Sequence, residues 1–388
     1  MQEQAILERN AAVMAGRKVI SADSHINEPP TVFDRLPVQF RDRKPVMMRG
    51  PDGGDGWSFD GKPPKRTFGI EAMAGIAKKD FKLTGMRFDE IRKGNWDGSA
   101  HLADMDIDGI YGSVLFPANA IQVYLLADRE LGLACMRSYN DWILEDFQGT
   151  DAKRIVGLPM LPTDDGIEAT LAEFERVVKK GAKGCFIPGM PEKPYNHPYY
   201  EPLWKAASDA DISLSLHRTF GGRPDKTDWD ELVDQRVSVG GIVFRYFSSV
   251  RPLTYMIFAG VFDRHPNLKI VAAEVDNGWI PFWAQTMDQQ WEAQQAWFPQ
   301  KLEHKPSDFL GVNCFVTTIE DYVGYDLIKT GKYPYLAKAT MFSTDYPHSA
   351  TIWPNSRSVA EKLTDGMSEA DKEMVLAGNA TRIYHFGR

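Results

Sequence analysis

The chain has 388 residues, of which 43% are hydrophobic and 12% aromatic, and its formal net charge is −8. This acidic balance argues against non-specific binding to nucleic acids or to anionic membranes, because both favour clustered Lys and Arg. No apolar stretch is long enough to span a bilayer, and the N-terminus MQEQAILERN carries charge where a signal peptide needs its apolar core, so we expect a cytoplasmic protein.

Short β-branched or apolar runs recur along the chain, and most are followed by Pro, Gly or a polar residue and then by a helical pattern. Strands that alternate with helices predict a parallel sheet, and eight of them predict closure into a (β/α)8 barrel. An open doubly wound sheet is the alternative, but no G-x-G-x-x-G follows the first run. The eight predicted strands are KVISAD (18–23), GSVLFP (112–117), RIVGLPM (154–160), AKGCFIP (182–188), ISLSLH (212–217), LKIVAAE (268–274), VNCFVTT (312–318) and ATMFSTD (339–345).

Amphipathic helices are predicted between these strands. The segment DDGIEATLAEFERVVKKG repeats apolar residues at spacings of three and four and ends at Gly181, which completes a strand, helix, strand unit. Ser368 and Asp371 have the spacing of a capping box at the start of the last helix. The other predicted helices span 121–148 and 252–264, and the last spans 368–386.

The connections between the strands are uneven in length. Residues 29–100 separate the first two strands and contain MRGPDGGDGWSFDGKPPKR, which indicates a turn-rich hairpin. We predict one domain over 1–388, with 29–100 as an insertion that forms a lid over the barrel mouth, where Trp57 and Phe59 shape the pocket. A second long excursion, 218–266, follows the fifth strand.

Chemistry in such a barrel is expected at the carboxyl ends of the strands. Asp23 and His25 end the first strand, His217 the fifth, Glu274 the sixth and Asp345 the eighth. One polar residue at a strand end is explained by capping of the next turn. Acidic or imidazole groups at four of eight strand ends on one rim instead predict a bound cation, because several negative charges would otherwise stay unneutralised in a partly dry cavity.

Four further residues have both a functional and a structural interpretation. Glu28 either binds metal or accepts backbone N–H groups in the turn before two prolines. His348 follows Asp345 by three residues on the same rim loop and is a candidate substrate contact. Arg218 could pair with a substrate carboxylate or remain solvated. Trp279 could line the pocket or pack at a helix start.

Four motifs in chain order carry a resemblance to a known family: DSHINEPP, SLSLH, RHPNLKIVAAE and FSTDYPHSA. They resemble the amidohydrolase superfamily, and more narrowly its branch of barrel hydrolases and decarboxylases related to aminocarboxymuconate semialdehyde decarboxylase. The resemblance covers about residues 18–386 and implies a (β/α)8 (TIM) barrel. It also implies that Asp23 and His25 supply the first-strand ligands, His217 the fifth-strand ligand and Asp345 the eighth-strand ligand.

One position departs from the pattern of this branch. Its members commonly have a histidine followed by glycines at the sixth strand end, whereas this chain has Glu274 in AEVDNGWIP. The role of that histidine therefore cannot be transferred. Glu274 could act as a base or bind metal, and with Asp23, Glu28 and Asp345 it would make a site rich in oxygen ligands, for one divalent ion or two.

We therefore expect a metal-dependent hydrolase, in which metal-activated water attacks a carbonyl carbon of a small organic substrate such as an amide, ester or thioester. Asp345, Glu274 and His217 are the expected catalytic groups, zinc is the first expectation for the metal, and iron or manganese are alternatives. Non-oxidative decarboxylation of an aromatic or unsaturated acid is the first alternative, and a ligand-binding barrel without activity is the second. Barrels of this branch often pair, so we expect a homodimer or a higher homo-oligomer.

Overall fold

The computed structural model describes residues 2–59, 61–64, 66–217, 239–297, 299 and 301–387. Within these residues every predicted run forms a strand, and all the strands of the barrel run parallel. Their side chains are buried on both faces, as in other parallel sheets covered by helices. The strands are β1 (Ile20–His25), β4 (Gly112–Phe116), β5 (Ile155–Gly157), β6 (Gly184–Phe186), β7 (Ser213–His217), β8 (Ile270–Ala273), β9 (Cys314–Thr318) and β10 (Thr340–Phe342).

The strands form two hydrogen-bonded sheets that join into a ring. One sheet has the order β1-β4-β5 and the other β10-β9-β8-β7-β6. Between β5 and β6, the backbone N–H of Phe186 donates to Pro159 O at 2.8 Å. At the other junction, the N–H of Asp345, just past β10, donates to Asp23 O at 3.1 Å. The predicted (β/α)8 barrel is confirmed.

Small side chains inside the barrel make room for an aromatic ring from the end of the chain. A Cβ atom at Gly184 would lie 3.0 Å from Tyr384 Cδ1 and from Ser213 Oγ. The Tyr384 hydroxyl is 2.8 Å from Ser215 Oγ, so its polar atom is hydrogen-bonded where it is fully buried. The last helix thus fills part of the barrel interior.

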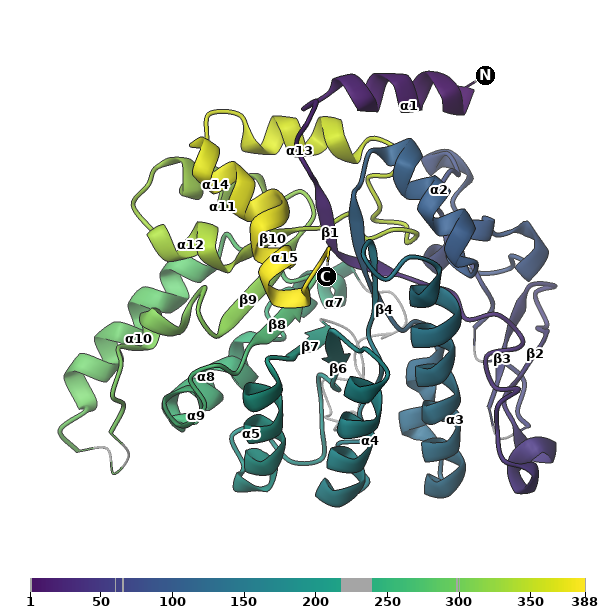
Figure 1. Ribbon diagram of the computed structural model, residues 1–388, viewed down its shortest axis with the longest axis horizontal. Coiled ribbons are helices and arrows are strands. Elements are labelled where there is room, and N and C mark those ends of the chain that lie inside the picture. Colours follow the sequence, from purple (N-terminus) through teal and green to yellow (C-terminus); the bar gives the residue numbers. More distant parts are fainter. Residues whose placement is uncertain are drawn as a thin grey trace.

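Helices surround the strands in Figure 1, where α3, α4 and α5 lie along one side of the barrel and α1 lies near α13 at the opposite end of the view. The helices are α1 (Gln2–Ala12), α2 (Gly98–Asp108), α3 (Arg129–Asp141), α4 (Ile167–Lys179), α5 (Glu201–Ala210), α7 (Val239–Arg245), α8 (Val250–Phe258), α9 (Val261–Arg264), α10 (Ile280–Gln294), α11 (Tyr322–Lys329), α12 (Pro334–Ala339), α13 (Ser356–Thr364), α14 (Glu369–Glu373) and α15 (Asn379–Tyr384).

Three predicted helices are interrupted. Residues 121–148 do not form one helix, because the Asp128 side chain caps a new start at α3, after a 3-10 helix at Asn119–Leu125 and before a π-helix at Trp142–Phe147. Gly260, with a φ of 66°, separates α8 from α9. The last segment begins at Ser368, whose side chain accepts the Asp371 N–H as predicted, and contains a π-helix between α14 and α15.

The insertion contains the predicted hairpin. Strands β2 (Val46–Arg49) and β3 (Asp55–Ser58) pair antiparallel, and Gly50 N–H donates to Gly54 O across the turn. The Trp57 ring is buried against Phe33, 5.2 Å between centroids, so it belongs to the core of the insertion. The rest of the insertion contains short 3-10 helices at Val38–Arg43, Ile70–Ala72, Lys78–Asp80, Phe88–Glu90 and Lys93–Asn95.

One part of the insertion reaches the rim of the barrel. The N–H groups of Met73 and Ala74 both donate to Pro347 O, and Ser349 N–H donates to Ile70 O at 2.7 Å. Residues 70–74 therefore lie against the loop that follows β10. That the insertion acts as a lid, and that the chain is a single domain, remain predictions.

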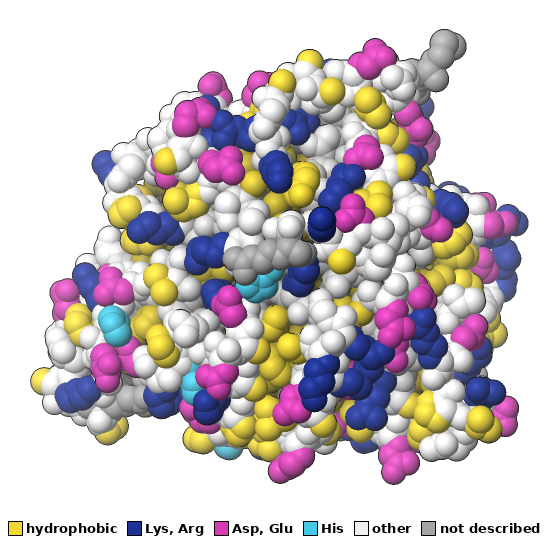
Figure 2. Space-filling view, viewed as in Figure 1, with side chains coloured by type: hydrophobic (Ala, Val, Ile, Leu, Met, Phe, Trp, Pro, Cys, Tyr) yellow, Lys and Arg dark blue, Asp and Glu magenta, His cyan; other side chains and the backbone are white. Residues whose placement is uncertain are grey.

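The surface shown in Figure 2 carries acidic and basic side chains interspersed with hydrophobic ones. In the described residues, no helix has both the length and the apolar character needed to cross a bilayer. The second long excursion, 218–266, lies in part outside the described residues, since 218–238 are not among them.

Candidate metal centre

Four of the predicted strand-end side chains meet at the carboxyl end of the barrel. Asp23 and His25 lie on β1, His217 is the last residue of β7, and Asp345 follows β10. His25 Nε2 is 3.2 Å from Asp345 Oδ1 and 3.5 Å from Asp23 Oδ1, and His217 Nε2 is 3.8 Å from that same Asp23 oxygen. All four side chains are buried. Residues up to 322 positions apart in the chain thus share one small volume, as their strand-end positions predict.

The donor atoms form two overlapping groups that suit a divalent ion. Asp23, His25 and His217 make one group, and His25, Asp345 and His348 make the other, with the ligand atoms of each group within 4.8 Å of one another. Carboxylate oxygens and imidazole nitrogens together are ligands for zinc, manganese and iron. The two groups share His25, and their residues fit the divalent metal that the sequence predicts.

Glu274 lies beside this centre. It directly follows β8, its backbone is in the left-handed region with a φ of 58°, and its Oε2 is 3.3 Å from His217 Nε2. A positive φ is uncommon for a residue with a side chain and is often found at functional sites. The carboxylate is therefore placed to act on His217 or on a ligand of the metal.

Thr317 connects Glu274 to Asp23 and was missed in the sequence. Its Oγ1 on β9 donates to Asp23 Oδ2 at 3.1 Å and accepts the Glu274 N–H at 2.7 Å. This hydroxyl orients both neighbours, and the residue is fully buried. In the sequence Thr317 is indistinguishable from other β-branched strand residues. Only its position near the end of β9, facing the barrel interior, could have indicated that it bonds to Asp23 and Glu274.

His348 lies on the rim as predicted, in direct contact with two of the candidate metal ligands. Its ring stacks on that of His25 with centroids 3.8 Å apart, and its Nδ1 is 3.0 Å from Asp345 Oδ1. The side chain is 23% exposed, whereas that of Asp345 is 1% exposed. His348 is therefore the member of this group that solvent reaches, and a direct ligand role is as compatible with its position as substrate binding.

Opposite charges in the group shift both pKa values. Burial would raise the pKa of Asp345, but the neighbouring His348 and His25 hold it well below its usual range. Burial would lower the pKa of His348, but the Asp345 carboxylate outweighs it, with help from Glu274 and Glu71, and the pKa of His348 is raised. Without metal, the geometry thus favours an ion pair between these two side chains.

Glu28, predicted to bind metal or to accept backbone N–H groups, lies among such groups in the structure. Its carboxylate accepts the backbone N–H groups of Ala118, Asn119 and Ala120 at 2.8 to 3.0 Å, so both oxygens are already bonded. Glu28 is in neither of the two candidate ligand groups. The geometry supports the interpretation of Glu28 as an acceptor of backbone N–H groups. These groups belong to the turn after β4 and not to the turn that follows Glu28. Burial raises the pKa of this carboxyl despite these bonds.

The two remaining candidates have different outcomes. Arg218 lies outside the described residues. The indole N–H of Trp279 donates to Val275 O at 2.8 Å and its ring packs 5.4 Å from that of Trp283, which agrees with packing at a helix start. Substrate contact for either residue stays a prediction.

An apolar residue at the site was also missed. Phe116, the last residue of β4, is fully buried, and its ring centroid is 5.4 Å from that of His217 and 6.0 Å from that of His25. The strand-end rule was applied to polar residues alone, and the same rule applied to apolar residues indicates Phe116 as a neighbour of the two histidines.

Known proteins share this fold and sequence pattern. The chain is 26% identical over 307 residues to gamma-resorcylate decarboxylase of Rhizobium sp. (strain MTP-10005), an alignment that covers 72% of this chain and 84% of that protein. The structure resembles that of an amidohydrolase from Mycobacterium avium subsp. paratuberculosis K-10, with a TM-score of 0.73, 19% identity and coverage of 95% and 98%.

A second solved structure has a metal in it. Dihydroxybenzoic acid decarboxylase from Polaromonas sp. JS666, with bound manganese and the inhibitor 2-nitroresorcinol, matches with a TM-score of 0.64, 20% identity and coverage of 96% and 98%. The model of the amidohydrolase family matches residues 117–386, which include every barrel strand after β4. The chain belongs to the amidohydrolase family, as its motifs suggest.

Proposed function

We propose that this enzyme is a metal-dependent, non-oxidative decarboxylase of a small hydroxylated aromatic carboxylic acid. The observation that carries the proposal is the buried cluster of Asp23, His25, His217 and Asp345, in a chain whose curated relatives are gamma-resorcylate decarboxylases. Hydrolysis was the leading expectation from the sequence. The relatives favour the alternative, decarboxylation. The alignment with one of them covers 72% of this chain.

The four clustered residues would hold one divalent ion. When bound, such an ion supplies positive charge that binds a substrate carboxylate together with a neighbouring hydroxyl oxygen. Manganese replaces zinc as the first metal to test, because a decarboxylase of the same fold contains it. The mixed oxygen and nitrogen donors are compatible with both metals and with iron.

The protein must also provide a proton. Decarboxylation breaks the bond between a ring carbon and the carboxyl group, and carbon dioxide leaves. The electron pair of that bond stays with the ring carbon, which takes up a proton to form a C–H bond. His348, whose Nδ1 lies 3.0 Å from the Asp345 carboxylate, is placed to pass a proton to this carbon. Because His348 is partly exposed, it can take up the replacement proton from solvent.

The pocket wall suits an aromatic substrate. Phe116 places a buried ring beside both histidines of the cluster, and the Phe186 ring lies 6.3 Å from it in an edge-to-face arrangement. Aromatic rings prefer such offset and edge-on contacts with one another. A benzoic acid held at the cluster would therefore have aromatic neighbours on this side.

The test compares two panels of substrates on the same preparation. Protein treated with a chelator and then reloaded with Mn²⁺ or Zn²⁺ is incubated with 2-hydroxy- and 2,6-dihydroxybenzoic acids, and separately with aryl esters, amides and thioesters. We expect carbon dioxide and the matching phenol from the acids, loss of this activity without metal, and no activity in His217→Ala. Acid release from the second panel with no carbon dioxide from the first would reject the proposal.

Hydrolysis keeps one supporting observation, the acidic Glu274 at 3.3 Å from His217, where it could serve as a base towards a metal-activated water. Glu274→Gln keeps the size of the side chain and removes its charge. Ester or amide hydrolysis in the wild type that this variant loses, at unchanged metal content, would support the hydrolase interpretation.

Self-association also remains a prediction. Several large apolar side chains are exposed on helices α7 and α10, among them Phe244 and Phe282, each 75% exposed. Sedimentation velocity on the purified protein would show a dimer or a higher homo-oligomer if the prediction is right.

A further inference from the structure

The backbone at Asp345 adopts a conformation that needs support. Its φ is 50°, in the left-handed region that costs energy for a residue with a side chain. The position of its carboxylate among His25 and His348 depends on this conformation, because the residue lies in a loop after β10 and not in the strand itself. The neighbouring contacts must therefore hold the loop in place.

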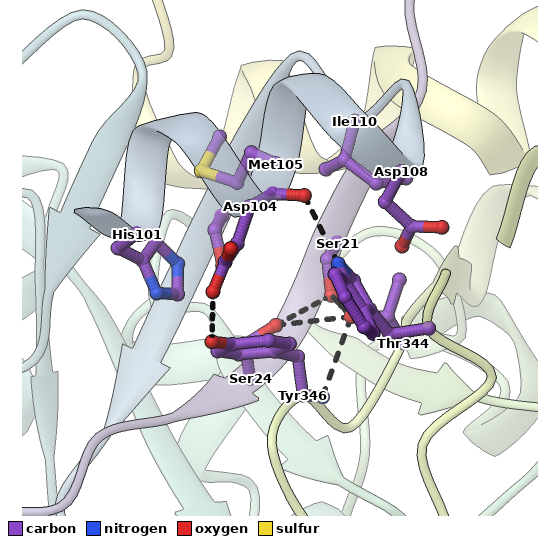
Figure 3. Close-up of a pocket in the computed structure, with 11 residues that line it drawn as sticks. Ser21, Ser24, His101, Asp104, Met105, Asp108, Ile110, Thr344 and Tyr346 are labelled. Atoms are coloured by element: carbon purple, nitrogen blue, oxygen red, sulfur yellow. Dashed lines mark hydrogen bonds between the residues drawn. The ribbon is translucent and has the colours of Figure 1, made fainter. Parts of the chain in front are cut away.

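Tyr346, the next residue, is anchored at both ends. Its carbonyl oxygen accepts the backbone N–H of His25 at 2.5 Å, which ties the loop to β1 beside a second candidate ligand. Its side chain is 4% exposed and its hydroxyl donates to Asp104 Oδ2 on α2. Figure 3 shows this hydrogen bond between the Tyr346 ring and the Asp104 carboxylate, on the side of β1 that faces α2.

Asp104 is itself held rigidly. Arg92 Nε lies 2.8 Å from both of its carboxylate oxygens, and the Arg92 guanidinium lies over the ring of Trp353, 4.5 Å from the centroid. The Trp353 indole N–H donates to Asp104 O at 3.0 Å. A carboxylate with an arginine partner and a fixed backbone is a firm acceptor for the tyrosine hydroxyl.

A cluster of hydroxyl groups supports the other side of the loop. Ser21 Oγ lies 2.9 Å from Ser24 Oγ and 3.0 Å from Thr344 Oγ1, and it accepts the Thr344 N–H at 2.9 Å. Between these hydroxyls and Asp104 lies a cavity of about 10 Å³, which is room for about one water molecule. If the tyrosine hydroxyl is removed, a water molecule in this cavity can donate to Asp104 in its place. The chain should therefore still fold.

We propose that Tyr346 and Asp104 are positioning residues for the metal ligands: their hydrogen bond holds Asp345, and through the Tyr346 carbonyl also His25, in the geometry that binds the ion. The inference rests on the proposed metal centre. It concerns residues that would touch neither metal nor substrate and that act on the ligands through the backbone of one loop.

The experiment measures Mn²⁺ binding to metal-free protein by calorimetry, with thermal unfolding recorded for each variant. Tyr346→Phe removes only the hydroxyl, and we expect its Mn²⁺ dissociation constant to rise about tenfold or more, as for other changes behind metal ligands. Tyr200→Phe is the matched control, because Tyr200 is fully buried and its hydroxyl donates to the backbone oxygen of Lys193 at 3.1 Å.

The outcomes separate the two proposals. Weaker Mn²⁺ binding in Tyr346→Phe than in Tyr200→Phe, at similar unfolding temperatures, supports the positioning role. Equal binding in Tyr346→Phe and the wild type overturns it and leaves the metal centre intact. If Tyr346→Phe does not fold, Asp104→Ala, which removes the acceptor oxygens, is judged by the same comparison. A wild type that binds no Mn²⁺ would instead remove the metal centre and the proposed function.

Discussion

Thr317 offers the sharpest test of how the metal ligands are held. Replacing it with valine keeps the shape of the side chain and removes one oxygen, so two buried partners lose their hydrogen bond at once. These are the Asp23 carboxylate, 3.1 Å from the hydroxyl, and the Glu274 N–H, 2.7 Å from it. A hydrogen bond to a charged group contributes about 1.5 to 3 kcal/mol, and a buried unsatisfied N–H costs about 1 to 3 kcal/mol.

The expected loss in the free energy of unfolding of Thr317→Val is therefore about 2.5 to 6 kcal/mol. Thr317→Ser is the matched control, since it keeps the hydroxyl and loses one buried methyl group, at a cost of about 1 kcal/mol. The valine variant should also bind Mn²⁺ more weakly, by about tenfold or more, because Asp23 is no longer oriented.

The assay is urea unfolding of metal-free protein followed by tryptophan fluorescence, with a chelator present so that metal binding does not contribute. Similar losses of stability in Thr317→Val and Thr317→Ser would show that the hydroxyl contributes little. That result would refute the explanation that Thr317→Val loses stability because the hydroxyl bonds to both Asp23 and Glu274.

Two further predictions concern buried ionisable groups. Glu28→Gln should lose about 2 kcal/mol of stability, because an amide NH₂ replaces an oxygen that accepts backbone N–H groups. Elemental analysis should show an unchanged metal content in this variant. A loss of metal would support Glu28 as a ligand. Burial lowers the pKa of His101 from 6.5 to about 4, so its neutral form stabilises the fold fully above pH 6.5 and about 3 kcal/mol is lost as the pH falls from 6.5 towards 4. In His101→Gln this part of the pH dependence of unfolding should be absent, and an unchanged dependence between pH 7 and 4 would contradict the assignment.

The strand positions and the clustering of the candidate metal ligands were predictable for a common reason. Residues at the carboxyl ends of parallel strands share one rim whatever their separation in the chain, so Asp23, His25, His217 and Asp345 could be grouped from local patterns alone. The strand runs are local signals too, because each depends on a few consecutive buried side chains.

Glu28 shows where this reasoning stops. It lies three residues after His25, and its sequence context is the same whether its carboxylate faces a metal or a loop. The backbone N–H groups that it binds belong to residues about ninety positions later, after β4. Interrupted helices show the same limit, since α3 passes into a π-helix at Trp142 although no Gly or Pro marks this point in the sequence.

The sequence by itself determined the barrel, its order of strands, the family and the core of the candidate metal-binding group. Alternation of strands and helices and the identity of strand-end residues are properties of short segments. The tertiary structure alone decided the partners of those residues: Thr317 between Asp23 and Glu274, His348 stacked on His25, and Tyr346 anchored to Asp104. These contacts join segments far apart in the chain, and they exist only once closure of the ring brings β1 beside the loop that follows β10.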